Sequence, residues 1–127
     1  EALNEDRKSI NGSEILVLGI AYKKNVDDNR ETPAAEIIER LAALGANISY
    51  HDPHLPRFPE MRRYELDLQS VALDENVLKE SDAVLIVTDH DDVDYALVGR
   101  NASLVVDTRN AMARVPADEV SARIVKA

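Results

Sequence analysis

Short apolar runs, separated by helix-like segments, restrict the fold of this chain more than any other feature of its sequence. Residues 14–19, 83–87 and 104–107 are largely apolar at successive positions and lack the alternation expected of a strand with one face in water. Such runs are typical of strands buried on both faces of a parallel sheet. Residues 46–50 form a further extended segment that stops before Pro53. The sequence therefore predicts a parallel sheet of at least four strands.

Helix signals occupy the intervals between these strands. Thr32-Pro33 is typical of a helix start, and apolar residues then recur at helical spacing up to Gly45. Further elements are expected as helices over 73–79 and 92–98, a small strand over 66–71, and a helical or mixed tail over 114–127. Strands that alternate with helices imply right-handed crossovers. We therefore expect an α/β fold with a doubly wound, mostly parallel, Rossmann-like sheet and helices on both faces.

The composition narrows the classes of function. The chain has 127 residues, of which 45% are apolar, enough for one domain with its own core. It holds 15 lysines and arginines against 24 aspartates and glutamates, a net charge of -9 that disfavours binding to DNA or RNA. The absence of cysteine excludes a disulfide scaffold, a thiolate metal site and a thiol nucleophile from this chain. No apolar run approaches the roughly 20 residues that span a bilayer, so no membrane partner is expected.

Cations gather where this fold binds ligands. Ligands of doubly wound sheets lie beyond the carboxyl ends of the strands. The loop after the first strand carries three cations before a helix start, Lys23, Lys24 and Arg30, and Arg109 follows the last of the four strands. Helix amides and basic side chains together favour the binding of a phosphate or carboxylate. On an acidic protein such a cluster is stronger evidence for an anion site, because the rest of the surface repels the same ligand. The alternative is that the loop cations only pair with the nearby acids Asp27, Asp28 and Glu31.

Two other patterns at this edge are less specific. Gly19 stands alone without a G-x-G-x-x-G turn, so NAD binding in the ordinary Rossmann manner is not expected. Asp52 occupies the place of a ribose-binding acid, but a turn-capping aspartate is the favoured interpretation. His51 and His54 flank Asp52, and His90 lies among aspartates, yet this spacing is unspecific and we predict no metal site.

Four motifs carry a resemblance to a known family. They are residues 17–33 (VLGIAYKKNVDDNRETP), 50–53 (YHDP), 82–90 (DAVLIVTDH) and 106–110 (VDTRN). In register over about residues 12–112, they resemble the C-terminal domain of the UDP-glucose/GDP-mannose dehydrogenase family. On this basis residues 1–11 are expected to be the end of that family's central helical region, and residues 12–127 the nucleotide-sugar-binding domain.

The resemblance implies an activity for a longer enzyme. Members of the family oxidise the C6 alcohol of a nucleotide sugar to a carboxylate in two NAD-dependent steps, for polysaccharide precursors in the cytoplasm. NAD would be bound mainly by an N-terminal domain and the cysteine nucleophile carried by the central, oligomer-forming domain; both are absent here. The implied residues are Tyr22, Lys23 and Arg109 for the sugar nucleotide, Arg30 for NAD, and Asp28 as the residue that orients Lys23 or Arg30. This chain is therefore expected to hold no catalytic residue and to be inactive alone.

Departures from the family pattern point to one branch. Tyr22, Val26 and Thr32 stand where other members commonly have phenylalanine, threonine and serine. With the motifs around Asp52 and His90, they resemble most the UDP-N-acetylglucosamine/UDP-N-acetylmannosamine 6-dehydrogenase branch.

Two functions of other classes remain as alternatives. A receiver-like phospho-aspartate module would suit an acidic α/β domain, but Asp52 ends the second strand rather than the third, and Arg109 stands where a lysine is expected. A ligand-free interaction domain would make the cations at the carboxyl edge dispensable.

Overall fold

A computed structural model describes residues 12–20, 33–54 and 70–126 of the chain. In chain order its elements are β1 (Glu14–Leu18), α2 (Pro33–Ala43), β2 (Asn47–His51), α3 (Glu75–Glu80), β3 (Ala83–Ile86), α4 (Tyr95–Asn101), β4 (Leu104–Asp107), the 3-10 helices η1 (Ala111–Arg114) and η2 (Ala117–Glu119), and β5 (Arg123–Lys126). The four main predicted strands, which correspond to β1, β2, β3 and β4, and the helix that begins at Pro33 are thereby confirmed. No helix in the described part of the chain is long and apolar enough to cross a membrane.

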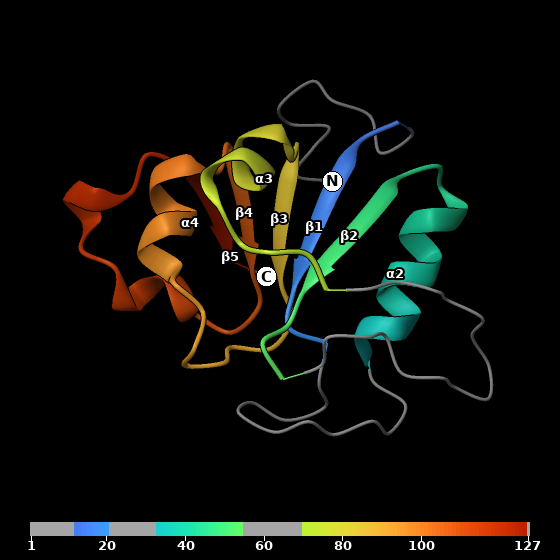
Figure 1. Ribbon diagram of the computed structural model, residues 1–127, viewed down its shortest axis with the longest axis horizontal. Coiled ribbons are helices and arrows are strands. Elements are labelled where there is room, and N and C mark those ends of the chain that lie inside the picture. The colour runs from blue at the N-terminus through green and yellow to red at the C-terminus, as the bar shows by residue number, and fades with distance from the viewer. Residues whose placement is uncertain (1–11, 21–32, 55–69, 127) are drawn as a thin grey trace.

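The sheet has five strands in the order β2-β1-β3-β4-β5, and every neighbouring pair is parallel. The chain moves outward from β1 to β2 and then crosses back to β3 on the other side of β1. This reversal creates a switch point between β1 and β3, where doubly wound sheets leave a crevice for ligands. The carboxyl ends of the strands lie along the lower edge of the sheet in Figure 1.

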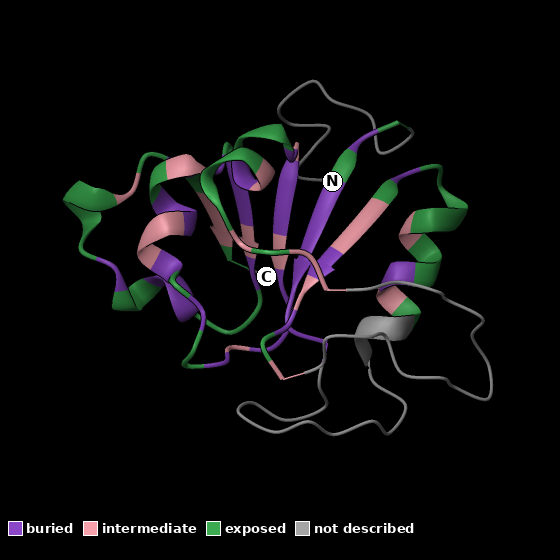
Figure 2. Cartoon of the chain, in the orientation of Figure 1, coloured by how far each residue is buried: buried purple, intermediate pink, exposed green. Residues whose placement is uncertain are grey.

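The two faces of β1 explain its apolar run. Ile15 and Val17 pack on the side of α2, against Ile38, whereas Leu16 and Leu18 pack on the opposite side. There they meet α3 and α4, and all of these strand side chains are at most 5% exposed. Figure 2 shows this purple central layer between helices with green outer surfaces. Burial of each such side chain stabilises the fold by about 1.5 to 3 kcal/mol. Because successive strand residues face opposite sides of the sheet and helices cover both sides, apolar residues occur at successive positions.

Two details differ from the sequence prediction, and a third lies largely outside the described residues. α4 begins at Tyr95 and not at residue 92, because the Asp94 side chain accepts a hydrogen bond from the Leu97 amide (3.1 Å) and caps the helix there. β5 was not predicted at all. Its residues are half-exposed or exposed, as suits a short strand at the edge of a sheet, so no apolar run marks it. The expected strand over 66–71 lies mostly outside the described residues. Of its two described residues, Ser70 forms a single parallel bridge with Tyr50.

Alkaline stability should depend on two buried tyrosines. Burial, reinforced by the Asp52 carboxylate, raises the pKa of Tyr50 to about 12, and burial also raises the pKa of Tyr95. An unfolded tyrosine ionises near pH 10, so the folded state alone retains these protons above that pH. The contribution of these two tyrosines should therefore be constant below about pH 9, and stability should fall between about pH 10 and pH 12 by up to about 1.4 kcal/mol per pH unit for each retained proton.

Urea denaturation at a series of alkaline pH values checks this expectation. Tyr50→Phe has no phenol to retain, so its stability should fall less steeply with pH than that of the unaltered chain. Equal slopes for the two proteins would show that Tyr50 does not hold its proton in the folded state.

Candidate functional site

The carboxyl edge of the sheet brings together segments that are far apart in the sequence. Gly19 and Ile20 follow β1, Asp52 follows β2, Val87 to His90 follow β3, and Thr108 and Arg109 follow β4. Four of the residues predicted for the site, Tyr22, Lys23, Asp28 and Arg30, lie outside the described residues. The predicted gathering of the loop cations with Arg109 therefore stays a prediction, and the geometry below concerns the described residues of the edge.

The ends of β1 and β3 touch through their backbones. Gly19 has a φ of +81°, and a Cβ atom added to it would lie 2.4 Å from the carbonyl oxygen of Thr88. The Gly19 amide donates to the His51 carbonyl (2.9 Å), and the amide of Val87 donates to the Leu18 carbonyl (3.0 Å). Only glycine combines this backbone conformation with so close an approach. Gly19, which has no second glycine of a G-x-G-x-x-G turn after it, therefore joins the ends of β1 and β3 at the switch point rather than opening a dinucleotide turn.

The Arg109 side chain is anchored at this edge by a hydrogen bond from its Nε atom. Its Nε donates to the carbonyl of Val87 (2.9 Å), and its backbone amide donates to Asp107 Oδ1 (3.0 Å). The residue is exposed, and within the described residues its two terminal nitrogens make no hydrogen bond or ion pair. A guanidinium fixed in this way presents the planar pair of donors that binds phosphate oxygens in a bidentate manner.

Asp107 organises the turn that carries Arg109. The carboxylate is 1% exposed and accepts from the amides of Arg109 (3.0 Å), Ala111 (3.1 Å) and Met112 (2.9 Å). It thus supports the start of η1 after Asn110, whose φ of 58° is left-handed. The sequence interpretation placed Asp107 at the edge but missed this role. An aspartate directly before a turn was the available signal, because such side chains accept from amides a few residues ahead.

Removing this carboxylate should destabilise the chain. Asp107→Ala leaves the buried amides of Ala111 and Met112, and the amide of Arg109, without their acceptor. We expect a loss of about 2 to 4 kcal/mol in the free energy of unfolding, measured by urea denaturation. Asp118→Ala, which removes an exposed aspartate of η2, should change it by less than about 0.5 kcal/mol. Equal stability of the two variants would contradict the assigned role of Asp107.

Asp52 is engaged inside the protein and does not face the solvent. It is 1% exposed; its Oδ1 accepts from the His54 amide (2.8 Å) and its Oδ2 from the Ile20 amide (2.8 Å). The favoured interpretation of Asp52 as a turn-capping residue is confirmed. Because both carboxylate oxygens are already bonded and buried, this residue suits neither a ribose hydroxyl nor a phosphoryl group, as the receiver-like alternative would need.

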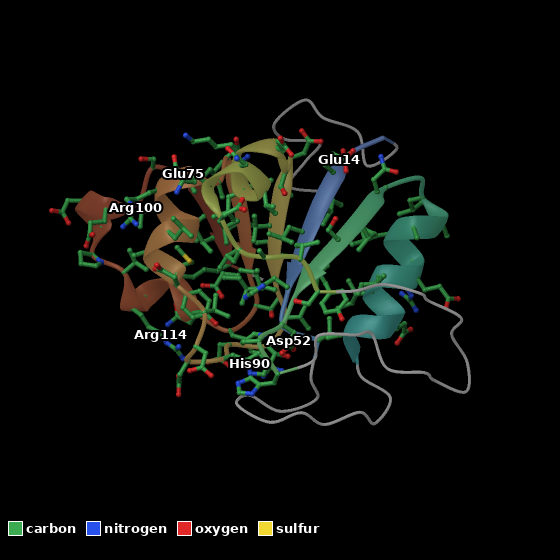
Figure 3. All side chains as sticks on the ribbon, viewed as in Figure 1. Glu14, Asp52, Glu75, His90, Arg100 and Arg114 are labelled. Atoms are coloured by element: carbon green, nitrogen blue, oxygen red, sulfur yellow. The ribbon has the colours of Figure 1, made fainter. Side chains whose placement is uncertain are left out.

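One histidine from each of the two sequence clusters, His54 and His90, lies in a single cluster in space, whereas the His51 ring contacts the Val71 carbonyl (Nδ1 to O, 2.7 Å). His90 is fully buried and its Nε2 lies 3.0 Å from Asp52 Oδ2. The rings of His54 and His90 have centroids 4.6 Å apart, and His54 Nε2 lies 3.2 Å from Asp92 Oδ2, close enough for an ion pair but without hydrogen-bond geometry. Figure 3 shows Asp52 and His90 side by side at the lower edge of the sheet. Within the described residues no group of three potential ligands is arranged to hold a metal ion.

Comparison of the chain with known proteins gives one consistent family. The sequence pattern of the UDP-glucose/GDP-mannose dehydrogenase family, UDP binding domain, matches residues 16–114. A UDP-N-acetyl-D-mannosamine dehydrogenase of Methanococcus maripaludis is 34% identical over 119 residues, which cover 87% of this chain and 26% of that protein. A UDP-glucose 6-dehydrogenase of Bacillus subtilis is 38% identical over 89 residues, covering 66% of this chain and 19% of that protein.

Solved structures with the same fold belong to the same kind of enzyme. The UDP-D-ManNAc dehydrogenase of Pyrococcus horikoshii superposes with a TM-score of 0.72 and 25% identity, over 98% of this chain and 28% of that one. A UDP-glucose dehydrogenase of Pyrobaculum islandicum superposes with a TM-score of 0.70 and 28% sequence identity, over 99% of this chain and 27% of that one. The chain thus spans about a quarter of the length of such relatives. It belongs to the UDP-glucose/GDP-mannose dehydrogenase family and corresponds to the UDP-binding domain of that family.

Proposed function

We propose that this chain binds the nucleotide part of a UDP-sugar at the carboxyl ends of β1, β3 and β4. The observation that carries the proposal is the Arg109 side chain, fixed through Nε on the Val87 carbonyl and exposed at the switch-point edge. A diphosphate needs fixed cationic donors, and on a protein of net charge -9 such donors are the places where an anion is attracted. Arg109 is accordingly proposed to bind the diphosphate or a sugar hydroxyl.

The remaining contacts are proposed from the matching motif. Tyr22 and Lys23 come two and three residues after Ile20 in the sequence. We assign both to the sugar nucleotide as well. Asp28 is assigned to orient Lys23 or Arg30. All four lie in the region matched by the family pattern.

The whole protein is proposed to be an NAD-dependent UDP-sugar 6-dehydrogenase that supplies polysaccharide precursors. We assign residues 1–11 to the end of a central helical region that forms a homo-oligomer, place the enzyme in the cytoplasm, and assign Arg30 to the interdomain contact with NAD. The described residues do not suit NAD itself, because the turn after β1 has a single glycine and the Asp52 carboxylate is buried in internal bonds. This domain alone is therefore expected to lack dehydrogenase activity.

The proposed substrate class is a UDP-N-acetylhexosamine. Tyr22, Val26 and Thr32 support this branch, as do relatives whose names specify UDP-N-acetyl-D-mannosamine. Relatives named for UDP-glucose are similar to a comparable degree, so the branch rests on these few positions.

Calorimetric titration of the chain tests the proposed function. UDP and UDP-N-acetylglucosamine should bind with the same stoichiometry, because the nucleotide supplies the contacts, whereas uridine without phosphates should bind at least about tenfold more weakly. NAD, which carries a diphosphate but no uridine, serves as the control and should not compete. Equal binding of uridine and UDP would show that no phosphate contact is made, and failure of every uridine nucleotide to bind would refute the proposal.

A further inference from the structure

The Asp52 carboxylate joins three strand ends across the switch point. It follows β2, accepts the amide of Ile20 after β1, and bonds His90 after β3, with distances of 2.8 Å and 3.0 Å to the same oxygen. Because β2 and β3 flank β1 in the sheet, the pair spans the end of β1 from both sides. Asp52 and His90 are separated by 38 residues, and their side chains have no exposed surface.

We infer that Asp52 and His90 are positioning residues of the proposed nucleotide-sugar site, an inference that rests on the proposed function above. The pair fixes the separation of the β1 and β3 ends, which border the crevice. It also fixes the segment that holds Arg109, since the Val87 carbonyl that accepts from Arg109 Nε lies three residues before His90. The binding donors of Arg109 are thereby tied to the end of β1.

Neighbouring contacts restrain the same segment from the other side. The Tyr95 hydroxyl donates to the His90 carbonyl (2.9 Å), and Arg114 bonds both Asp89 (3.0 Å) and Asp91 (3.2 Å). Arg114 also lies over the Tyr95 ring, 5.3 Å from its centroid. The backbone of residues 88–92 is thus restrained on its outer side. The Asp52–His90 pair is the buried side-chain connection from this segment to the ends of β1 and β2, beside the Thr88 amide on the Leu18 carbonyl (3.3 Å) and the His54–Asp92 contact (3.2 Å).

Stability alone does not account for this pair. A buried carboxylate and imidazole must both be removed from water, so replacing such a pair by apolar side chains is often neutral or stabilising. An apolar pair cannot form directional hydrogen bonds. The carboxylate accepts from the amides of His54 and Ile20 and from His90, and so sets the relative positions of three segments to within hydrogen-bond tolerance.

Three variants separate positioning from packing. His90→Leu removes the donor, whereas His90→Gln places an amide nitrogen near the position of Nε2 and restores it. Asp52→Asn keeps the shape but offers one acceptor oxygen in place of two, so one of the donors on its two sides loses its partner. Leu78→Ala is the matched control, because Leu78 is fully buried and belongs to α3, which lies toward the opposite end of the sheet from this edge (Figure 1).

The experiment measures UDP affinity by calorimetry and unfolding by urea for each variant. We expect His90→Leu and Asp52→Asn to weaken UDP binding about tenfold or more, because a shift of the strand ends misplaces the donors. His90→Gln should recover most of the affinity. Leu78→Ala should be less stable and yet bind UDP as the unaltered chain does. In proton exchange, either the Ile20 amide or the His54 amide should lose protection in Asp52→Asn, because the single acceptor oxygen can face only one side.

The outcomes distinguish the two proposals. If the unaltered chain binds UDP and His90→Leu and Asp52→Asn bind it equally well, the positioning role is refuted and the proposed function stands. The role is also refuted if Leu78→Ala loses affinity to the same extent, or if His90→Gln binds no better than His90→Leu. If the unaltered chain does not bind UDP, the proposed function fails, and the inference fails with it. Should His90→Leu not fold, the near-isosteric Asp52→Asn decides.

Discussion

Replacing Gly19 by alanine should remove most of the stability of this chain. The φ of +81° at this residue is unfavourable for any residue with a Cβ, by about 1 to 2 kcal/mol. The larger effect is steric, because the added atom would lie 2.4 Å from the carbonyl oxygen and 2.7 Å from the Cβ of Thr88. Thr88 is 3% exposed and sits on backbone that bonds to the end of β1, so it has little room to move. We expect a total loss of at least about 4 kcal/mol, out of the 5 to 15 kcal/mol typical of a domain.

Gly12 provides the matched control. Its φ is +82°, nearly the same as that of Gly19, but among the described residues a Cβ added there would have no heavy atom within 4 Å apart from its chain neighbours. Gly12→Ala should therefore show the backbone effect alone, a loss of about 1 to 2 kcal/mol in urea denaturation. If Gly19→Ala were no less stable than Gly12→Ala, the contact between the ends of β1 and β3 would not exist as described.

Replacing Arg109 by alanine should weaken UDP binding by about 30-fold to 150-fold. This range corresponds to the 2 to 3 kcal/mol that a charge-assisted bond to a phosphate typically contributes. The structure gives a reason for a value at the upper end, since Nε is already bound to the Val87 carbonyl and little side-chain freedom is left to lose on binding. Calorimetry with UDP measures the change.

Two further variants define what Arg109 contributes. Arg109→Lys keeps the charge but has neither the Nε donor nor the paired terminal donors, so we expect most of the affinity to be lost. Arg100→Ala removes the same charge from α4, where Arg100 is exposed and 3.8 Å from Glu119, and should leave UDP binding unchanged. Equal effects of Arg109→Ala and Arg100→Ala would mean that only the net charge matters and that Arg109 makes no specific contact.

The sheet was predictable from the sequence because of where its strands lie. β1, β3 and β4 are covered on both faces, so their apolar residues occur at successive positions and are easily recognised. β5 escapes recognition because an edge strand between Arg123 and Lys126 needs no such run. The order of the strands does not follow from local patterns either, although it decides that β2 and β3 lie on either side of β1.

The site was predictable in part for the same reason. The position of Arg109 at the carboxyl edge follows from its place just after a strand, and its functional assignment came from the matching motif. The partnership of Asp52 with His90 could not be predicted, because it joins residues 38 positions apart through the order of three strands. The sequence pattern instead indicated two separate histidine clusters.

Amide NMR of the isotope-labelled chain, titrated with UDP, UDP-N-acetylglucosamine and NAD at about millimolar concentration, tests the central claim most directly. The account predicts shifts of Gly19, Ile20, Val87, Thr88 and Arg109 with both uridine nucleotides, their loss in Arg109→Ala, and no matching shifts with NAD. Unchanged amides along this edge with UDP, or the same shifts in Arg109→Ala as in the unaltered chain, would contradict a nucleotide-sugar site at the carboxyl ends of β1, β3 and β4.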